Sequence, residues 1–307
     1  MVTRSIVAGA GPAHRVRQHG AVATTLPTTS DPTVATRIPV RRPAGRTFAD
    51  PPGWAFLGPS ALLLGLLGGP LVMLLWTGVT EDFAGYLREP TVREAIRLSL
   101  LTSVASTTIV VSLGTPLAYL LALRSFRGRW LVELLVDLPI VLPPMVAGIA
   151  LLLAFGTQGW FGSHLAALGI RLPFTTFAVV LAQAFVATPL FVRAARVGFA
   201  AVDHSIIEAS VIDGAGELQR FRHVLLPSAE KALLTGVVLA WARALGEFGA
   251  TIFFAGNLPG TTQTMPLAIF IGFESNLGTA IALSVILMLA SAAVLVVLRL
   301  FGDRRAG

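Results

Sequence analysis

Residues 203–227 read DHSIIEASVIDGAGELQRFRHVLLP, a polar interruption between two long apolar stretches. Its start carries residues that begin helices, because the side chain of Asp203 or Ser205 can accept a hydrogen bond from a free backbone N–H. Ser205 and Glu208, three residues apart, also have the spacing of a capping box. This part of the sequence therefore predicts a short helix within a loop.

The middle of the same stretch indicates where that helix ends and what it offers to a partner. Gly214 can adopt the left-handed backbone conformation that closes a helix, and Asp213 borders the turn. Ala209 and Ser210 are small, so another surface can approach the backbone closely at these positions. We expect a helix that is displayed outside the bilayer and docks into a groove of a partner protein.

Six apolar stretches accompany this loop, and each has the roughly 20 residues that a helix needs to cross the hydrocarbon core of a bilayer. They are too long and too continuous for the strands of a barrel, the other structure that satisfies the backbone in lipid. The sequence predicts an all-α membrane protein with six transmembrane helices. The predicted spans are residues 56–79, 95–123, 132–156, 175–199, 231–255 and 277–300.

Composition supports this class and excludes others. Of 307 residues, 54% are hydrophobic and 13% are charged, against about 25% charged residues in a typical soluble domain. Lys231 is the only lysine, and its neighbours do not form the Gly-Lys-Ser/Thr end of a phosphate-binding loop. Cysteine is absent, which excludes thiolate metal sites and catalytic thiols. We expect no metal site, no bound cofactor and no nucleic-acid partner.

Arginine placement predicts the orientation. Residues 1–52 are basic and show no helical periodicity, so we expect a disordered cytoplasmic tail ahead of a transmembrane domain at 53–303. The loops near 124–129 and 200–230 are also basic, whereas the loop near 256–276 carries no arginine or lysine. Because basic loops stay on the cytoplasmic side, both termini are expected in the cytoplasm.

The loop also carries a family resemblance. The spacing resembles the EAA loop of ABC-transporter permeases of the importer type, whose pattern is Glu-Ala-Ala, three residues, Gly, nine residues and Ile-x-Leu-Pro. Ser210 replaces the second alanine, and Val224 replaces the isoleucine. The matching residues are Glu208, Ala209, Ser210, Gly214, Val224, Leu226 and Pro227. The resemblance implies a six-span bundle of the MetI-like kind, in which residues 200–230 hold the coupling helix that sits in a cleft of the ATPase subunit.

Residues 134–156 and 241–270 look like the molybdate-type permeases, whose relatives transport tungstate and sulfate. That resemblance implies a non-catalytic subunit in the cell membrane of a prokaryote. It further implies a permease homodimer, two ATP-binding subunits that hold ATP and magnesium, and an extracytoplasmic oxyanion-binding protein. Molybdate or tungstate is the expected cargo, with sulfate or another oxyanion as the alternative.

Two groups of residues are candidates for the translocation path. Pro139, Pro143 and Pro144 interrupt the third predicted span, and broken helices at membrane depth often line a watery cavity. Arg243 and Glu247 sit four residues apart in the fifth predicted span and can neutralise each other. Each proline can equally serve packing alone, and for Arg243 and Glu247 a structural ion pair near the interface is slightly favoured over a role in the path. Glu247 is also the coupling carboxylate that an ion-driven secondary transporter would need, a less favoured class that gives no reason for the EAA spacing. A membrane-embedded enzyme is disfavoured because no constellation of nucleophile, base or metal ligands is recognisable.

Overall fold

A computed structural model describes residues 53–80 and 82–303, so the predicted tail at 1–52 lies outside the described residues. Every regular element within the described ranges is a helix. From residue 58 onward the chain forms one compact unit, and residues 53–57 contribute the first turn of its first helix, α1 (Gly53–Thr80). The predicted all-α class is confirmed.

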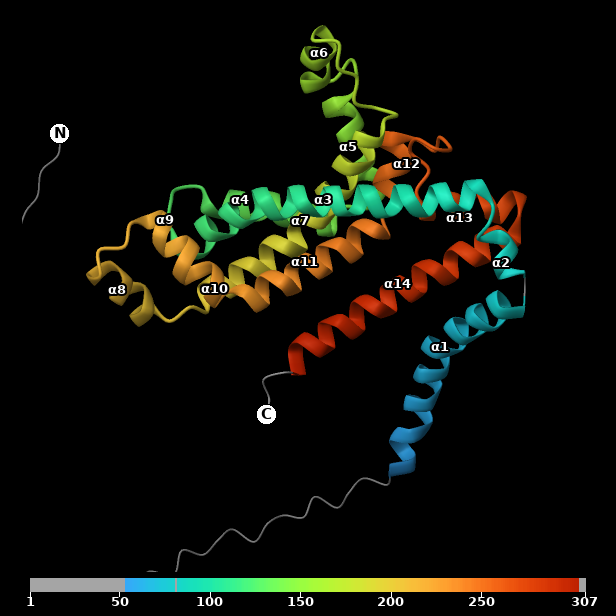
Figure 1. Ribbon diagram of the computed structural model, residues 1–307, viewed down its shortest axis with the longest axis horizontal. Coiled ribbons are helices and arrows are strands. Elements are labelled where there is room, and N and C mark those ends of the chain that lie inside the picture. Colours follow the sequence, from blue (N-terminus) through green and yellow to red (C-terminus); the bar gives the residue numbers. More distant parts are fainter. Residues whose placement is uncertain (1–52, 81, 304–307) are drawn as a thin grey trace, which may run out of the picture. The chain divides into compact units, whose positions relative to one another are not determined.

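Helix α7 (Thr176–Ala200) lies at the centre of the unit and packs along α3 (Pro90–Leu123) and α11 (Glu230–Leu245) (Figure 1). Small residues permit these close crossings. A Cβ built on Gly198 would lie 2.5 Å from the Cβ of Ala232, and one on Gly114 would lie 2.8 Å from the Phe191 ring. Close approach through small residues is how helices associate in lipid, where no hydrophobic force drives them together.

Two further helix pairs pack against this trio. Helix α14 (Leu277–Asp303) packs against α13 (Met265–Ser275), and α5 (Pro144–Phe155) packs against α12 (Gly249–Ala255). The other elements are α2 (Phe83–Tyr86), α4 (Arg129–Val141), α6 (Trp160–Ala167), α8 (His204–Ile212), α9 (Glu217–Arg220), the π-helical turn η1 (Phe221–Leu225) and α10 (Leu226–Ser228).

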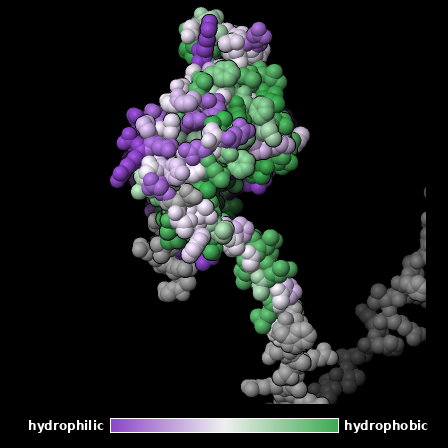
Figure 2. Space-filling view, turned by 90° about the vertical axis from the view of Figure 1, so that its right-hand side faces the viewer, coloured by the Kyte–Doolittle hydropathy of each residue, from purple (hydrophilic) through white to green (hydrophobic). Residues whose placement is uncertain are grey.

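Four helices are long and apolar enough to cross a membrane, namely α1, α3, α7 and α14. Two bent pairs meet the same criterion: α5 with α6, bent by 45°, and residues 217–228 with α11, bent by 74°. Figure 2 shows hydrophobic side chains gathered over a broad, continuous face of the compact unit, as contact with lipid requires. The described residues thus hold four to six candidate spans, in agreement with the expected six-helix membrane fold.

The third predicted span is not one helix. It consists of α4 and α5, separated by Leu142 and Pro143, whose ψ angles of 133° and 132° are extended. Both residues precede a proline, and the proline ring disfavours the helical conformation of the residue before it. Pro144 opens α5 at a position where its missing N–H costs nothing. Pro139 lies inside α4 without interrupting it, so only two of the three predicted breaks coincide with the observed one.

The fifth predicted span is also divided, since α11 ends at Leu245 and α12 begins at Gly249. No proline lies in the gap. Residues 256–276, expected to form a loop, contain the helix α13 (Met265–Ser275), which has Pro266 in its first turn. Short helices whose faces are covered by neighbours have no distinctive periodicity, which is why α13 was not predicted.

Candidate functional site

The polar stretch between α7 and α11 folds as predicted into a short displayed helix, α8. Asp203 is its N-cap, with Oδ1 accepting a hydrogen bond of 2.9 Å from the Ser205 N–H. Ser205 therefore occupies the second helical position, and the capping box expected between Ser205 and Glu208 is not formed. Of the two alternative caps in the sequence, the structure has Asp203.

The C-terminus of α8 is closed by Gly214, whose φ of +79° confirms the predicted left-handed conformation. The Gly214 N–H donates to the Val211 carbonyl and the Ala215 N–H donates to the Ser210 carbonyl, each at 3.0 Å. These two bonds form a Schellman motif, in which the last carbonyls of a helix are satisfied by the turn. With Asp213 at the C-cap, both ends of α8 are held without a partner protein.

The two faces of α8 differ. Ser210 is 9% exposed, and its hydroxyl donates to the Ile207 carbonyl, while Ile207 packs against the core. Glu208 and Ala209 are exposed, and Glu208 forms no ion pair with any residue in the described ranges. Exposed apolar side chains complete the outer surface of the loop: Ile206, Val211, Ile212 and Leu218. The outer surface thus combines apolar residues with an unpaired carboxylate.

Three aromatic rings connect this loop to the long helices. Phe221 in η1 lies 5.3 Å from Tyr119 of α3 and 6.1 Å from Phe199 of α7, measured between ring centroids. Leu226 packs against the same core, and Pro227 follows it within α10. Through these contacts η1 packs directly against α3 and α7.

A second connection is ionic. Glu217 Oε1 accepts hydrogen bonds from Arg124 Nη2 at 2.6 Å and from the Tyr119 hydroxyl at 2.9 Å. These bonds stabilise the carboxylate, so the Arg124 guanidinium and then the Tyr119 hydroxyl lower the pKa of Glu217. The contact is therefore complete at neutral pH and is lost only as the pH falls through the lowered pKa.

Replacing Glu217 with glutamine is expected to loosen the loop modestly, because both donors lose a charged acceptor. Hydrogen exchange of the backbone amides of residues 204–225 should increase at pH 7, and it should become similar to wild type at a pH where the wild-type carboxylate is protonated. Exchange unchanged at both pH values would contradict the anchoring role.

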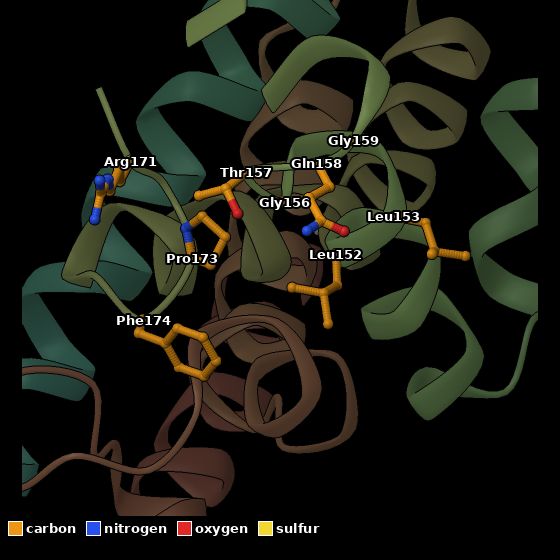
Figure 3. Close-up of a pocket in the computed structure, with 9 residues that line it drawn as sticks. All are labelled: Leu152, Leu153, Gly156, Thr157, Gln158, Gly159, Arg171, Pro173 and Phe174. Carbon is orange, nitrogen blue, oxygen red and sulfur yellow. The ribbon is translucent and has the colours of Figure 1, made fainter. Parts of the chain in front are cut away.

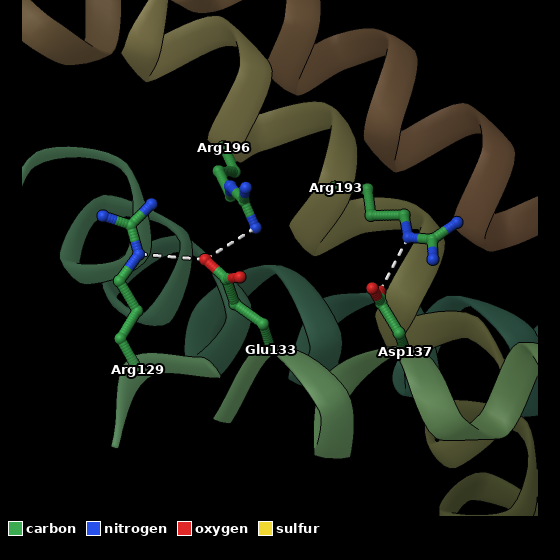
Figure 4. Close-up of polar contacts among 5 residues, drawn as sticks. All are labelled: Arg129, Glu133, Asp137, Arg193 and Arg196. Carbon is green, nitrogen blue, oxygen red and sulfur yellow. Dashed lines mark hydrogen bonds and ion pairs between the residues drawn. The ribbon is translucent and has the colours of Figure 1, made fainter. Parts of the chain in front are cut away.

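Helix α4 is fixed to α7 by ion pairs near the same end of the unit (Figure 4). Glu133 Oε1 accepts from Arg129 Nε at 2.9 Å and lies 3.0 Å from Arg196 Nη1, while Asp137 Oδ1 accepts from Arg193 Nε at 2.7 Å. The charges of α4 are thus neutralised by those of its neighbour. Arg129 lies four residues before Glu133 on the same helix, whereas the pairs with α7 join residues that are far apart in the chain.

The two helix breaks meet, and this was not evident from the sequence. The start of α5 lies against the start of α12, and together they border a cavity of about 250 Å³. The residues lining it are Pro144, Met145, Arg243, Gly246, Glu247, Phe248 and Gly249. Three of the five predicted path residues, Pro144, Arg243 and Glu247, therefore lie at one place, whereas Pro139 and Pro143 do not line the cavity.

Glycines permit the contact between α5 and α12. A Cβ on Gly148 would lie 2.7 Å from the Ala250 carbonyl oxygen, and one on Gly249 would lie 2.6 Å from the Pro144 Cβ. Distances this short leave no room for a side chain, so the two helices touch through their backbones. We call this contact between the starts of α5 and α12, where both divided spans meet, the joint.

Glu247 explains the break that no proline accounts for. Its side chain is 1% exposed, and Oε1 accepts a hydrogen bond of 2.7 Å from the Ala250 N–H at the start of α12. The other oxygen, Oε2, lies 2.8 Å from Arg243 Nη1 in an ion pair, without a hydrogen bond of good geometry. The predicted pair is present, although Glu247 follows the end of α11 instead of continuing its face.

A larger cavity of about 560 Å³ lies between the end of α5 and residues 171–174 (Figure 3). Thr157 and Gln158 line it, but Figure 3 shows the Arg171 guanidinium directed away from both. Its polar groups therefore do not converge on one position.

In the nearby stretch 256–264, the Thr262 hydroxyl accepts a hydrogen bond from the Leu258 N–H at 2.8 Å, which fits a folded loop. The described residues contain no group of three acidic, His or Cys side chains that could hold a metal ion.

A bundle of long apolar helices that displays a capped helix between two candidate spans is the architecture of a multi-pass membrane protein. Residues 114–307 match the family model described as "Binding-protein-dependent transport system inner membrane component", and the chain belongs to this family. It is therefore a multi-pass membrane permease of the ABC importer type, as the EAA-like loop predicted.

The resemblance to molybdate-type permeases is confirmed. The chain is 41% identical over 251 residues to the molybdenum transport system permease protein ModB of Mycobacterium tuberculosis, covering 80% of this chain and 92% of that protein. It is 34% identical over 231 residues to the sulfate transport system permease protein CysT of Salmonella typhimurium, covering 75% and 83%. A chain of a bacterial ABC transporter involved in alginate import shares the fold, with a TM-score of 0.65, 15% identity and coverage of 82% and 95%.

Proposed function

We propose that this permease carries molybdate or tungstate into the cytoplasm by alternating access, driven by ATP that a separate subunit hydrolyses. The observation that carries the mechanism is the loop with α8, capped at both ends and joined to α3 and α7 through Phe221. The similarity to ModB proteins supports the choice of cargo.

The same proposal assigns the partners. Two copies of the permease pair with two ATP-binding subunits, whose clefts receive the outer surface of α8, and an extracytoplasmic binding protein delivers the oxyanion. A solved relative of the same fold, the alginate transporter, is in complex with a pentasaccharide-bound periplasmic protein. The basic loops 124–129 and 200–230 face the cytoplasm in this arrangement, together with both termini.

Sulfate is the second candidate cargo, because the chain is also similar to the sulfate permease CysT. The deciding experiment is uptake of labelled molybdate by vesicles that contain the permease, its ATPase and its binding protein. We expect ATP-dependent uptake that excess tungstate inhibits and excess sulfate does not. Strong competition by sulfate would indicate that sulfate is the transported anion. Uptake that needs an ion gradient but no ATP would overturn the proposed mechanism.

Replacing Glu208 with alanine is expected to lower ATP-driven uptake at least tenfold without altering the fold, because Glu208 is exposed and makes no ion pair within the described chain. Loss of one charged partner at an interface typically costs about 2–5 kcal/mol of binding energy. Co-purification of the ATPase subunit and uptake in vesicles measure the effect. Glu274→Ala, which removes an exposed carboxylate from α13, is the matched control outside the loop. Normal uptake and normal assembly of the Glu208 variant would refute its docking role.

A further inference from the structure

We propose that Arg243 is a transient binding site for the transported oxyanion, and that Glu247 is a tethered competitor that keeps its affinity low. This inference rests on the proposed function and names the place in the permease where the tetrahedral anion is held during its passage. It concerns the cavity at the joint between α5 and α12, which is lined by Arg243, Glu247 and Pro144.

The position of Arg243 requires water on this face. The residue lies thirteen residues beyond Glu230, at the start of α11, which is about 20 Å along the helix at 1.5 Å per residue. Its side chain is 34% exposed. A charge at such depth is costly in hydrocarbon, so ionisable residues there face a bundle interior or a water-filled cavity. The neighbouring cavity of about 250 Å³ is large enough for several water molecules, each of which takes about 30 Å³ in the liquid.

Among the described residues, the N–H donors of the Arg243 guanidinium are not used in side-chain hydrogen bonds. Glu247 Oε2 lies 2.8 Å from Arg243 Nη1 but accepts no hydrogen bond of good geometry, and Arg243 donates none of the side-chain hydrogen bonds found among the described residues. An arginine presents five N–H donors in a planar fork, which suits the oxygens of a tetrahedral oxyanion. The carboxylate of Glu247 thus occupies a place that another anion can share or take.

Glu247 is held so that it competes without leaving. Its Oε1 caps the start of α12 through the Ala250 N–H at 2.7 Å, and its side chain is buried. The negative charge beside Arg243 therefore persists when an anion arrives, and like charges repel. Transport requires that the bound anion can dissociate again. The fixed carboxylate of Glu247 keeps the affinity for the anion low enough for this.

The test is equilibrium binding of labelled molybdate to the assembled permease–ATPase complex in detergent, without the binding protein. Glu247→Gln removes the charge and retains an oxygen for the Ala250 cap. We expect this variant to bind molybdate on the order of tenfold more tightly than the wild type, and excess tungstate should displace the label. Adding Arg243→Gln to it should return binding to the wild-type level. An ion pair that served packing alone would produce no gain of binding.

Asp137→Asn is the matched control, because it also removes a carboxylate from an arginine, here Arg193 at 2.7 Å, outside the cavity. An equal gain of binding in this control would overturn the assignment, since the effect would then reflect net charge. Arg243→Lys keeps the charge but not the fork, and with Glu247→Gln it should bind less tightly than the single variant.

Uptake measured in parallel separates this inference from the proposed function. If the wild-type complex transports oxyanion and Glu247→Gln binds no more molybdate than the wild type, the site is wrong and the function stands. If Glu247→Gln gains molybdate binding while the wild-type complex transports none, the site stands and the function is wrong. Where both hold, slower anion release should lower the maximal uptake rate of Glu247→Gln.

Discussion

Valine in place of Gly214 is expected to abolish most ATP-driven uptake while the permease stays folded in the membrane. A β-branched residue at φ +79° is strained by about 1–3 kcal/mol. The loop would relieve this strain by unwinding the last turn of α8 and losing the two bonds to the Val211 and Ser210 carbonyls. The ATPase cleft would then meet a helix end of a different shape. Affinity for the ATPase subunit should fall about 5- to 150-fold.

Titration of the ATPase subunit against the purified permease, together with vesicle uptake, measures this loss. Gly216→Val is the matched control, since Gly216 has φ −64° and ψ 165°, and a Cβ there meets nothing closer than 3.8 Å. Gly214→Asn should be intermediate, because asparagine tolerates the left-handed region better than valine. If Gly214→Val binds the ATPase subunit as tightly as the wild type, the Schellman turn is not part of the docking surface.

Alanine in place of Gly148 is expected to destabilise the permease by about 1–3 kcal/mol and to abolish transport, because the joint between α5 and α12 cannot accept a side chain. The added Cβ would lie 2.7 Å from the Ala250 carbonyl oxygen and 2.9 Å from its Cα. Both atoms belong to the backbone, so no rotamer change relieves the clash. Thermal unfolding of the purified permease in detergent measures the loss.

Gly246→Ala provides the comparison for this measurement. Gly246 lies at the same joint, yet its Cβ would meet only the Ala242 carbonyl oxygen at an ordinary 3.7 Å. We expect its unfolding temperature to stay close to that of the wild type. If the two alanine variants unfold at the same temperature, the backbone contact between α5 and α12 does not determine stability.

Local features were predictable from the sequence and were predicted. Gly214 ends α8 because its own backbone adopts the left-handed conformation, which depends on that residue alone. The long helices are predictable because the length and composition of each apolar stretch identify it as a candidate span. The break after Val141 was anticipated in kind, since Pro143 and Pro144 act on the residues directly before them. Each of these inferences needs only neighbours in the chain.

Features that depend on distant residues were not predictable. At the break after Leu245, the buried Glu247 accepts a hydrogen bond from the Ala250 N–H, beside residues of α5 that are distant in the sequence. The pairing of Asp137 with Arg193 joins residues that lie 56 positions apart. The roles of α8, Arg243 and Glu247 remain predictions, whereas the family and the all-α membrane fold are confirmed by comparison with known proteins.

The ion pairs between α4 and α7 bear on how the chain enters the membrane during synthesis. Helix α4 has 13 residues, too few to cross a bilayer alone, and Arg193, the partner of its Asp137, is made 56 residues later. At about 5–20 residues per second, the ribosome needs roughly 3–11 s to supply it. Until then the Asp137 carboxylate lacks this partner, so we expect α4 to pack in its final position only after α7 has emerged. The packing of α4 thus depends on a helix that has not yet been translated when α4 leaves the ribosome.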